Sequence, residues 1–219
     1  MTNHPAAAEA GLTLNDVEIR LGTRMLLRLS AAVAPGTALT VMGPSGSGKS
    51  SLLAFVAGFL DPAFTASGTV RLDGETVTRK PPNARRVGLL FQAPLLFPHL
   101  SVRGNLLFAI PSGAGSRQER MALAEAALEE AGLDGLGDRD PAALSGGQQA
   151  RVALMRVLLS KPRALLLDEP FSSLDAALKE QMRQVVFAKA RERGLPVLLV
   201  THDPEDARAA GGRIVDLGT

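Results

Sequence analysis

Short runs of hydrophobic residues alternate with longer amphipathic stretches along this chain. Runs of strand length lie at residues 38–42, 68–72, 87–91, 164–167, 195–200 and 213–217. Segments with apolar residues at helical spacing separate several of them, an order typical of a mostly parallel β-sheet covered by helices. The alternating sequence LTLNDVEIRL, within residues 12–33, instead favours an antiparallel sheet at the edge of the fold.

The helical segments indicate how the domain is organised. Helices are expected from residue 49 to about 60 and at residues 117–131, 148–160 and 175–193. Strand-like runs are missing between Gln92 and Ser160. We therefore expect one α/β domain of 219 residues, with a sheet core at about 12–91 and 161–217 and an inserted helical subdomain at about 92–160.

Composition excludes several classes of protein. With 46% hydrophobic residues, the chain can bury a core, and its longest apolar run, residues 52–60, is too short to span a bilayer. The first ten residues lack the pattern of a signal peptide, and the absence of cysteine excludes disulfides and thiolate metal sites. The net charge is +2 with scattered basic residues, and Trp and Tyr are absent, so nucleic acid is not an expected partner.

A glycine-rich segment, GPSGSGKS at residues 43–50, lies between an expected strand and an expected helix. Its glycines let the backbone turn successive N–H groups towards phosphate oxygens, and the helix start adds the positive end of its dipole. Lys49 would reach the β and γ phosphates of a nucleotide, and the Ser50 hydroxyl would coordinate Mg²⁺. A flexible Gly/Ser turn would explain neither the spacing nor the placement. The predicted nucleotide-binding residues here are Gly43, Pro44, Ser45, Gly46, Ser47, Gly48, Lys49, Ser50 and Ser51.

The apolar run at residues 164–167 ends in two acidic residues, Asp168 and Glu169. Both carboxylates are thereby placed at the carboxyl edge of the sheet, where open α/β sheets bind their ligands. Because successive strand residues point in opposite directions, Asp168 can hold Mg²⁺ through its water shell while Glu169 polarises an attacking water. Solvated carboxylates at a strand end are the simpler interpretation of this pair alone, but the nearby glycine-rich segment favours the catalytic one.

The sequence LSGGQQAR, at residues 144–151, predicts the start of a helix. Ser145 is a favourable N-cap, and Gln148 three residues later completes a capping box. Gly146 and Gly147 leave backbone N–H groups uncovered, so this helix start can bind an anion. A well-capped structural helix is the alternative interpretation of the segment taken alone.

Together these motifs resemble those of the ATP-binding subunits of ABC transporters. Along the chain they are GPSGSGKS, Gln92 after a strand, LSGGQQAR, LLLDEP, Ser173-Leu174-Asp175 and His202 at the end of a later strand. The resemblance covers about residues 12–217 and points to stand-alone ATPases of bacterial binding-protein-dependent importers, including uncharacterised ones labelled thiamine-like. It implies a P-loop NTPase with a mostly parallel sheet core, an N-terminal antiparallel β subdomain and an inserted helical subdomain.

The resemblance also implies how such an ATPase works. Two subunits would form a head-to-tail homodimer that holds two ATP molecules with Mg²⁺, each between the phosphate loop of one subunit and the signature segment of the other. The signature segment comprises Ser145, Gly146, Gly147 and Gln148. The implied catalytic residues are Lys49, Gln92, Glu169 and His202, the implied metal ligands are Ser50, Gln92 and Asp168, and Asp175 is the implied dimer contact.

Transport partners are a further implication of the resemblance. It implies solute import with two membrane permease subunits, indirectly a solute-binding protein, and a place on the cytoplasmic face of the membrane. Residues 91–106 resemble the surface that receives the permease, with Leu95, Leu96, Phe97 and Pro98 as apolar contacts. An exporter ATPase, a soluble ABC ATPase without a transport role and a small-molecule P-loop kinase are the alternatives.

Leu21 departs from the family pattern. It stands where the family usually places an aromatic residue for adenine to stack on, and the chain contains no Tyr or Trp. We expect Leu21 to cover the adenine through apolar contact alone. Recognition of the base should therefore be weak.

Overall fold

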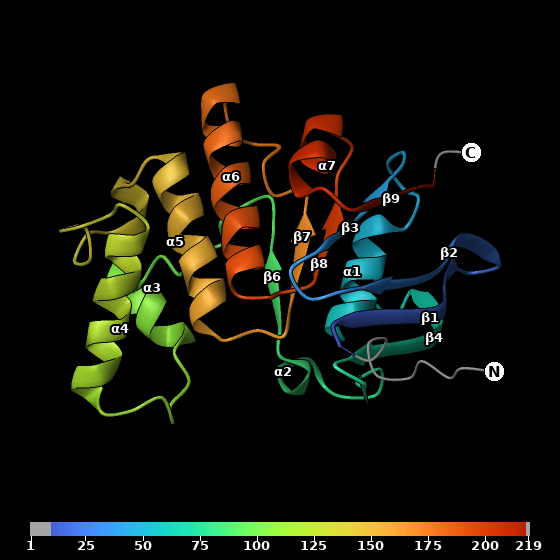
Figure 1. Cartoon of the computed structure of the whole chain (residues 1–219), viewed down its shortest axis with the longest axis horizontal. Coiled ribbons are helices and arrows are strands. Elements are labelled where there is room, and N and C mark those ends of the chain that lie inside the picture. The colour runs from blue at the N-terminus through green and yellow to red at the C-terminus, as the bar shows by residue number, and fades with distance from the viewer. Residues whose placement is uncertain (1–9, 218–219) are drawn as a thin grey trace, which may run out of the picture.

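The computed structural model describes residues 10–217 and contains two β-sheets with helices around them (Figure 1). The strands are β1 (Leu12–Leu21), β2 (Arg24–Val33), β3 (Ala38–Met42), β4 (Phe64–Leu72), β5 (Glu75–Thr76), β6 (Val87–Leu90), β7 (Ala164–Asp168), β8 (Val197–Val200) and β9 (Arg213–Asp216). The helices are α1 (Lys49–Ala57), α2 (Pro82–Arg85), α3 (Val102–Ala109), α4 (Arg117–Glu130), α5 (Gly146–Leu159), α6 (Ala176–Glu192) and α7 (Pro204–Ala210), with a 3-10 turn η1 (Pro141–Ala143).

The antiparallel sheet has the strand order β2-β1-β4-β5. In β1, Leu12 and Leu14 are buried before a shift of register, and Val17 and Ile19 are buried after it. Asp16 occupies the shift with a φ of 44°. The period-2 alternation of the sequence therefore predicts the sheet correctly. At the bulge the alternation of buried and exposed residues shifts by one residue and then continues.

The parallel sheet has the strand order β6-β7-β8-β3-β9, and every strand pair in it is parallel. In β7, Leu165 and Leu167 face one hydrophobic cluster, whereas Ala164 and Leu166 face another. Both faces of this strand are buried, which explains why its sequence is continuously apolar. The predicted α/β class with a mostly parallel core is confirmed.

The parallel sheet separates the two hydrophobic clusters. One cluster joins a sheet face to α3, α4, α5 and α6, and the other joins the opposite face to α1 and the antiparallel sheet. Leu52, Leu53 and Val56 of α1 are buried in the second cluster, and α1 contacts β4, β7 and β8. Helix α1 is thus fixed between the two sheets, and its first residues are fixed with it.

The regular elements between β6 and β7 are all helical, namely α3, α4, η1 and α5 in that order, and loops connect them. Helix α3 packs against both α4 and α5, and Figure 1 shows the three together on the side away from the antiparallel sheet. Helix α3, which the sequence did not reveal, begins at the N-cap Ser101, whose hydroxyl accepts a hydrogen bond from the Gly104 N–H. Within residues 10–217, no helix combines the length and apolar character needed to cross a bilayer.

The boundaries of α1 and β4 differ from the prediction. Helix α1 ends at Ala57, not near residue 60, because Gly58 adopts a left-handed conformation with a φ of 93° and its N–H returns to carbonyls of the last turn. Strand β4 begins at Phe64, which pairs with Leu21 of β1, and Gly68 lies within the strand instead of at its start. A Cβ at Gly68 would come within 2.4 Å of the Asp16 carbonyl oxygen, so this glycine permits the bulge.

The C-terminal part of the fold also differs in detail. Strand β8 begins at Val197 because the Leu195 N–H is bonded to the Ala190 carbonyl at 2.8 Å and closes the end of α6. Helix α7, unforeseen in the sequence, begins at the N-cap Asp203, whose side chain accepts from the Glu205 N–H.

Arg85 closes the C-terminal end of α1. Its side chain donates to the carbonyls of Phe55 at 2.7 Å and Val56 at 2.9 Å, and to those of Lys80 at 2.8 Å and Thr78 at 2.5 Å. The residue is 5% exposed, and burial lowers the pKa of its guanidinium. A buried cation therefore satisfies carbonyls that a helix end leaves open.

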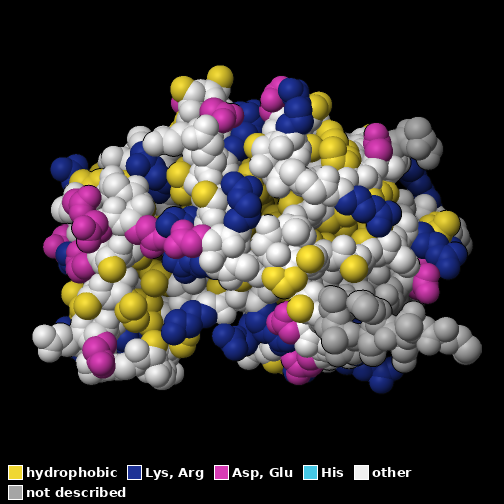
Figure 2. All heavy atoms as spheres, in the orientation of Figure 1, with side chains coloured by type: hydrophobic (Ala, Val, Ile, Leu, Met, Phe, Trp, Pro, Cys, Tyr) yellow, Lys and Arg dark blue, Asp and Glu magenta, His cyan; other side chains and the backbone are white. Residues whose placement is uncertain are grey.

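Charged side chains are mixed over the surface. Figure 2 shows Lys and Arg dispersed among acidic and uncharged residues on the face in view. This dispersal matches the nearly balanced net charge of +2.

Candidate nucleotide-binding site

Residues that follow three neighbouring strands of the parallel sheet line one cavity. Gly43 follows β3, Glu169 follows β7, and His202 lies two residues after β8, which stands between the other two strands. The cavity has a volume of about 470 Å³ and is lined by Glu169, His202 and all the predicted phosphate-loop residues except Ser47. The carboxyl edge of the sheet thus collects residues that are far apart in the sequence.

The phosphate loop is shaped by glycine at both ends. Gly43 has a φ of 149° and lies so close to Leu217 that a Cβ would come within 3.0 Å of the Leu217 Cβ. Gly48, the N-cap of α1, has a φ of 88°. Side chains at these positions would strain the backbone, which explains the glycine-rich sequence.

Lys49 supplies positive charge at the start of α1. It is only 7% exposed, and its Nζ donates to the carbonyl oxygens of Gly43 and Pro44, both at 2.8 Å. These bonds hold the ammonium group inside the loop, next to the amino end of the helix. The charge and the helix dipole together favour an anion in the cavity.

The two acidic residues at the end of β7 point into different spaces, as the sequence predicts. Glu169 lines the phosphate-loop cavity, whereas Asp168 lines a neighbouring cavity of about 330 Å³ beside Ser50 and Phe91. Glu169 has a φ of 45°, which turns the chain sharply, and its N–H donates to the Val200 carbonyl at 2.9 Å. A left-handed glutamate at a sheet edge is a strained arrangement of the kind found at functional sites.

Ser50 and Asp168 form an oxygen pair beside the loop. The Ser50 hydroxyl donates to Asp168 Oδ1 at 3.1 Å. Burial raises the pKa of Asp168; the Ser50 hydrogen bond and the positive charge of Lys49 oppose the increase, and the charge of Glu169 adds to it. Within residues 10–217 no group of three or more His, Asp or Glu residues could hold a metal ion. This hard-oxygen pair fits Mg²⁺, which proteins usually bind with one or two carboxylates plus substrate phosphates.

Glu169 and His202 lie in contact across the cavity wall. His202 Nδ1 is 3.2 Å from Glu169 Oε1, and the imidazole is 64% exposed, so most of its surface is available to a ligand. The backbone of Glu169 is fixed by Ser172, whose N–H and hydroxyl both donate to the Glu169 carbonyl, at 3.2 and 2.9 Å. A carboxylate and an imidazole are thus held together at the wall of the phosphate-loop cavity.

The signature segment begins α5, as predicted. The Ser145 hydroxyl accepts from the Gln148 N–H at 3.3 Å, and the Ser145 N–H donates to Gln148 Oε1 at 2.9 Å, which confirms the capping box. Gly147 is buried against Leu178 of α6. The segment lies outside the phosphate-loop cavity of its own chain.

Three other predicted site residues also lie outside this cavity. Gln92 follows β6 and lines a small cavity of about 100 Å³ with Gly146 and Ser173, and its carbonyl accepts from the Ser173 hydroxyl at 3.2 Å. Asp175 is the exposed N-cap of α6. Leu21 ends β1 and is 46% exposed.

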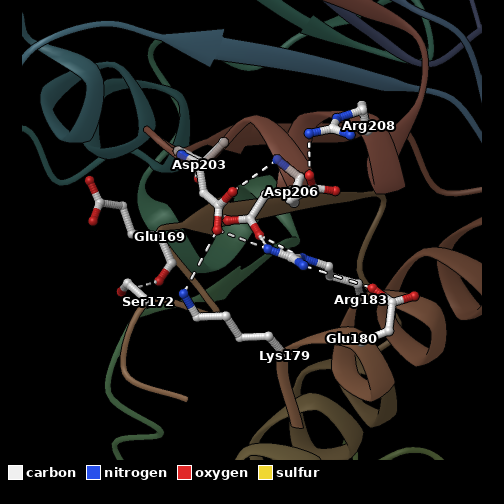
Figure 3. A network of polar contacts seen from close by, with 10 residues as sticks. Glu169, Ser172, Lys179, Glu180, Arg183, Asp203, Asp206 and Arg208 are labelled. Atoms are coloured by element: carbon white, nitrogen blue, oxygen red, sulfur yellow. Dashed lines mark hydrogen bonds and ion pairs between the residues drawn. The ribbon is translucent and has the colours of Figure 1, made fainter. Parts of the chain in front are cut away.

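A buried polar network beside the cavity was not foreseen in the sequence. Figure 3 shows Arg183 and Lys179 of α6 pointing towards Asp203 and Asp206 at the start of α7. Arg183 is the buried centre of this group, with a side chain 8% exposed. One signal was present, since Arg183 stands between the buried residues Met182 and Val186 of an amphipathic helix.

These features together are those of a nucleoside-triphosphate site in a P-loop protein. The chain belongs to the ABC transporter family, whose model matches residues 26–172.

Known proteins of this family resemble the chain over most of its length. It is 45% identical to the uncharacterised ABC transporter ATP-binding protein YnjD of Escherichia coli, over 90% of this chain and 91% of that one. It is 47% identical to the thiamine import ATP-binding protein ThiQ of Cereibacter sphaeroides, over 93% of this chain and 87% of that one. A solved structure, the dimeric ATP-binding cassette MJ0796 in a post-hydrolysis state with ADP and Pi, superposes with a TM-score of 0.77 at 32% identity and covers 94% of each chain.

Proposed function

We propose that the protein is the ATP-hydrolysing subunit of an ABC importer, which closes as a dimer on ATP and thereby drives two permease subunits. The observation that carries this function is the single cavity shared by the phosphate loop, Glu169 and His202. Family membership and the import role of the ThiQ relative support it. The exporter alternative has no observation in its favour.

ATP binds through its phosphates. The ammonium of Lys49 and the amino end of α1 offset phosphate charge, and the glycine-rich loop provides backbone N–H donors. Ser50 and Asp168 would hold Mg²⁺, which neutralises charge on the phosphates when it is bound. Gln92, the third ligand that the resemblance implies, lines a different cavity with Gly146 and Ser173.

Glu169 and His202 perform the hydrolytic step in this proposal. Glu169 orients the attacking water and accepts its proton, and the exposed His202 imidazole contacts the γ phosphate. Through their 3.2 Å contact, His202 holds the Glu169 carboxylate in position for the attacking water. Because Glu169 projects from a left-handed backbone at the strand end, its carboxylate faces the cavity and Asp168 is free for the metal.

The signature segment acts on the partner subunit. Since it lies outside the cavity of its own chain, it can complete the ATP site of a second copy, and the dimeric neighbour with bound ADP and Pi supports this arrangement. The exposed Ser145 and Gly146 contact the nucleotide of the other subunit, whereas Gly147 is buried against Leu178, and the exposed Asp175 touches the partner across the interface. Gln92, placed between Gly146 and Ser173, relays nucleotide binding to the helical subdomain at about 92–160.

The permease docks on the surface at residues 91–106. Leu95 at 57% and Phe108 of α3 at 68% are among the most exposed apolar side chains, and Phe97 packs edge to face with Phe108, with ring centroids 4.7 Å apart. Asn105 is fully buried and fixes the loop by hydrogen bonds to the Phe97 N–H and carbonyl. A fixed apolar surface suits a membrane partner helix. In this proposal the subunit works at the cytoplasmic face of the membrane through the permease, with the solute-binding protein as an indirect partner.

Two variants test the function. Glu169→Gln keeps the shape of the side chain but cannot accept a proton, so it should bind MgATP, hydrolyse it very slowly and remain dimeric with ATP. Ser145→Arg should show no ATP-dependent dimer, because a bulky cation would obstruct the opposing nucleotide. ATP hydrolysis and light scattering with and without ATP measure these effects.

Ser116→Arg is the matched control, because Ser116 also forms a capping box but begins α4. It should dimerise as the unaltered protein does. A Glu169→Gln protein that hydrolyses ATP at the normal rate would refute the role of Glu169. A Ser145→Arg protein that still dimerises with ATP would refute the signature contact.

A further inference from the structure

Arg183 is a buried cation that joins two carboxylates of the segment after β8. Its Nε donates to Asp206 Oδ1 at 2.7 Å, and its Nη2 donates to Asp203 Oδ2 at 2.9 Å (Figure 3). The Arg183 side chain is 8% exposed and that of Asp206 is 3% exposed, so little water competes for the bond between them. The fork of one guanidinium thus ties α6 to the start of α7.

The same network encloses His202 from both sides. The Thr201 hydroxyl donates to Asp206 Oδ2 at 2.7 Å and accepts from the Asp203 N–H at 3.0 Å. Thr201 is 1% exposed, so the residues before and after His202 are bonded to each other and to the group that Arg183 holds. The imidazole itself remains exposed and reaches Glu169. The backbone of His202 is therefore fixed while its side chain faces the cavity.

Helix α6 connects this network to the proposed dimer interface. Its N-cap is Asp175, the proposed contact to the partner, and Arg183 lies two turns further along the same helix. Lys179, one turn from the N-cap, also approaches Asp203 Oδ2, at 3.7 Å. A shift of α6 on dimer closure would thus be transmitted to the backbone on both sides of His202.

We propose that Arg183 is a positioning residue that holds His202 against Glu169 and links this pair to α6. The inference rests on the proposed function, in which His202 contacts the γ phosphate. Arg183 does not line the phosphate-loop cavity, so it acts on the hydrolytic step and leaves nucleotide binding to Lys49 and the amino end of α1.

The test is steady-state ATP hydrolysis by two variants. Arg183→Met removes the charge at similar length, and Arg183→Lys keeps the charge, which protects folding, but cannot bridge both carboxylates as a fork. Each should lower kcat about 10- to 100-fold, the effect of misplacing a catalytic group, with the KM for MgATP unchanged. Arg208→Met is the matched control, because Arg208 pairs with the exposed Glu205 on the outer side of α7, and it should keep the normal kcat.

The His202→Ala background separates positioning from general damage. If Arg183 acts through His202, adding Arg183→Lys to His202→Ala should lower kcat no further, because the two changes remove one function. A full further loss in that background would overturn the inference, as would a normal kcat for a folded Arg183→Lys protein.

The two hypotheses fail in different ways. Normal hydrolysis by His202→Ala itself would refute the role of His202 in the proposed function, and the inference would fall with it. A large loss in His202→Ala beside a normal Arg183→Lys would leave the proposed function intact and refute the positioning role alone.

Discussion

Replacing Arg85 by Met should destabilise the protein strongly without touching the nucleotide site. The side chain lies at the far end of α1 from Lys49, and its hydrogen-bond acceptors are the carbonyls of Phe55, Val56, Lys80 and Thr78. Methionine fills a similar length but donates no hydrogen bond. After the substitution, these carbonyls can accept hydrogen bonds only from other donors or from water that reaches them.

The magnitude follows from the number of open acceptors and their burial. Phe55 O keeps a second donor, the Gly58 N–H at 3.2 Å, whereas Val56 O is bonded to Arg85 in buried surroundings. One fully orphaned carbonyl costs about 1–3 kcal/mol, and three partly hydrated ones add about 0.5 kcal/mol each. Loss of a cation at the helix C-terminus adds about 0.3–1 kcal/mol. We expect a loss of roughly 4 kcal/mol, or about 8–16 °C in Tm for a chain of this size.

Urea unfolding followed by circular dichroism measures this loss, with an unchanged m-value as the sign that only stability has changed. Arg28→Met is the control, because that side chain is 61% exposed in its ion pairs and should cost at most about 0.5 kcal/mol. Arg85→Lys should fall between the two, since one ammonium reaches only some of the carbonyls. A loss below about 1 kcal/mol for Arg85→Met would refute the reasoning, because it would mean that water replaces the guanidinium without cost.

Three further predictions concern the site and its partners. Burial raises the pKa of Asp168, so its charge is disfavoured in the folded state and its contribution to stability declines as pH rises through the folded pKa. Asp168→Asn should therefore unfold at higher urea than the unaltered protein at pH 7, while losing Mg²⁺-dependent hydrolysis. The stability difference should disappear in acid, and a difference that persists there would contradict the assignment. Leu21→Tyr should tighten ATP about fivefold from roughly 1 kcal/mol of stacking, measured by competition between ATP and GTP, and no gain would show that another residue holds the base. Leu95→Glu, at a side chain 57% exposed, should leave ATP binding intact and reduce recovery of the permease in pull-downs, and unaltered recovery would place docking elsewhere.

Features encoded by neighbouring residues could be predicted from the sequence. The capping box of Ser145 and Gln148 needs only a three-residue spacing. The different directions of Asp168 and Glu169 are as expected, but their cause is not strand alternation, because Glu169 follows β7 with a left-handed backbone. The phosphate loop could be predicted for the same reason as the capping box, because its glycines and Lys49 lie within one continuous segment, residues 43–50.

Features that depend on distant partners could not be predicted. Arg183 finds Asp203 and Asp206 on another helix, 20 and 23 residues further along the chain, and its charge alone gives no sign of where they lie. The apolar Leu195 predicts an earlier start for β8 than the structure has, because the Leu195 N–H closes the end of α6 instead of joining the sheet. Only the family resemblance predicts that Leu21 covers the adenine. The distance between Leu21 and the phosphate loop depends on how the antiparallel sheet packs against the parallel sheet, which the sequence does not encode locally.

Helix α5 connects two functional regions, because the signature segment lies at its start and its last turn contacts the loop of the proposed permease surface. Its first turn follows Ser145, and Arg156 near its last turn donates to the carbonyls of Leu95 at 2.8 Å and Pro94 at 3.2 Å and lies over the Phe97 ring, 5.1 Å from its centroid. An α-helix of 14 residues is a stiff rod about 21 Å long. In the proposed mechanism, a tilt of the Ser145 end towards a second subunit would carry the loop at the other end with it, so this helix would act as a lever arm between the nucleotide and the proposed permease surface.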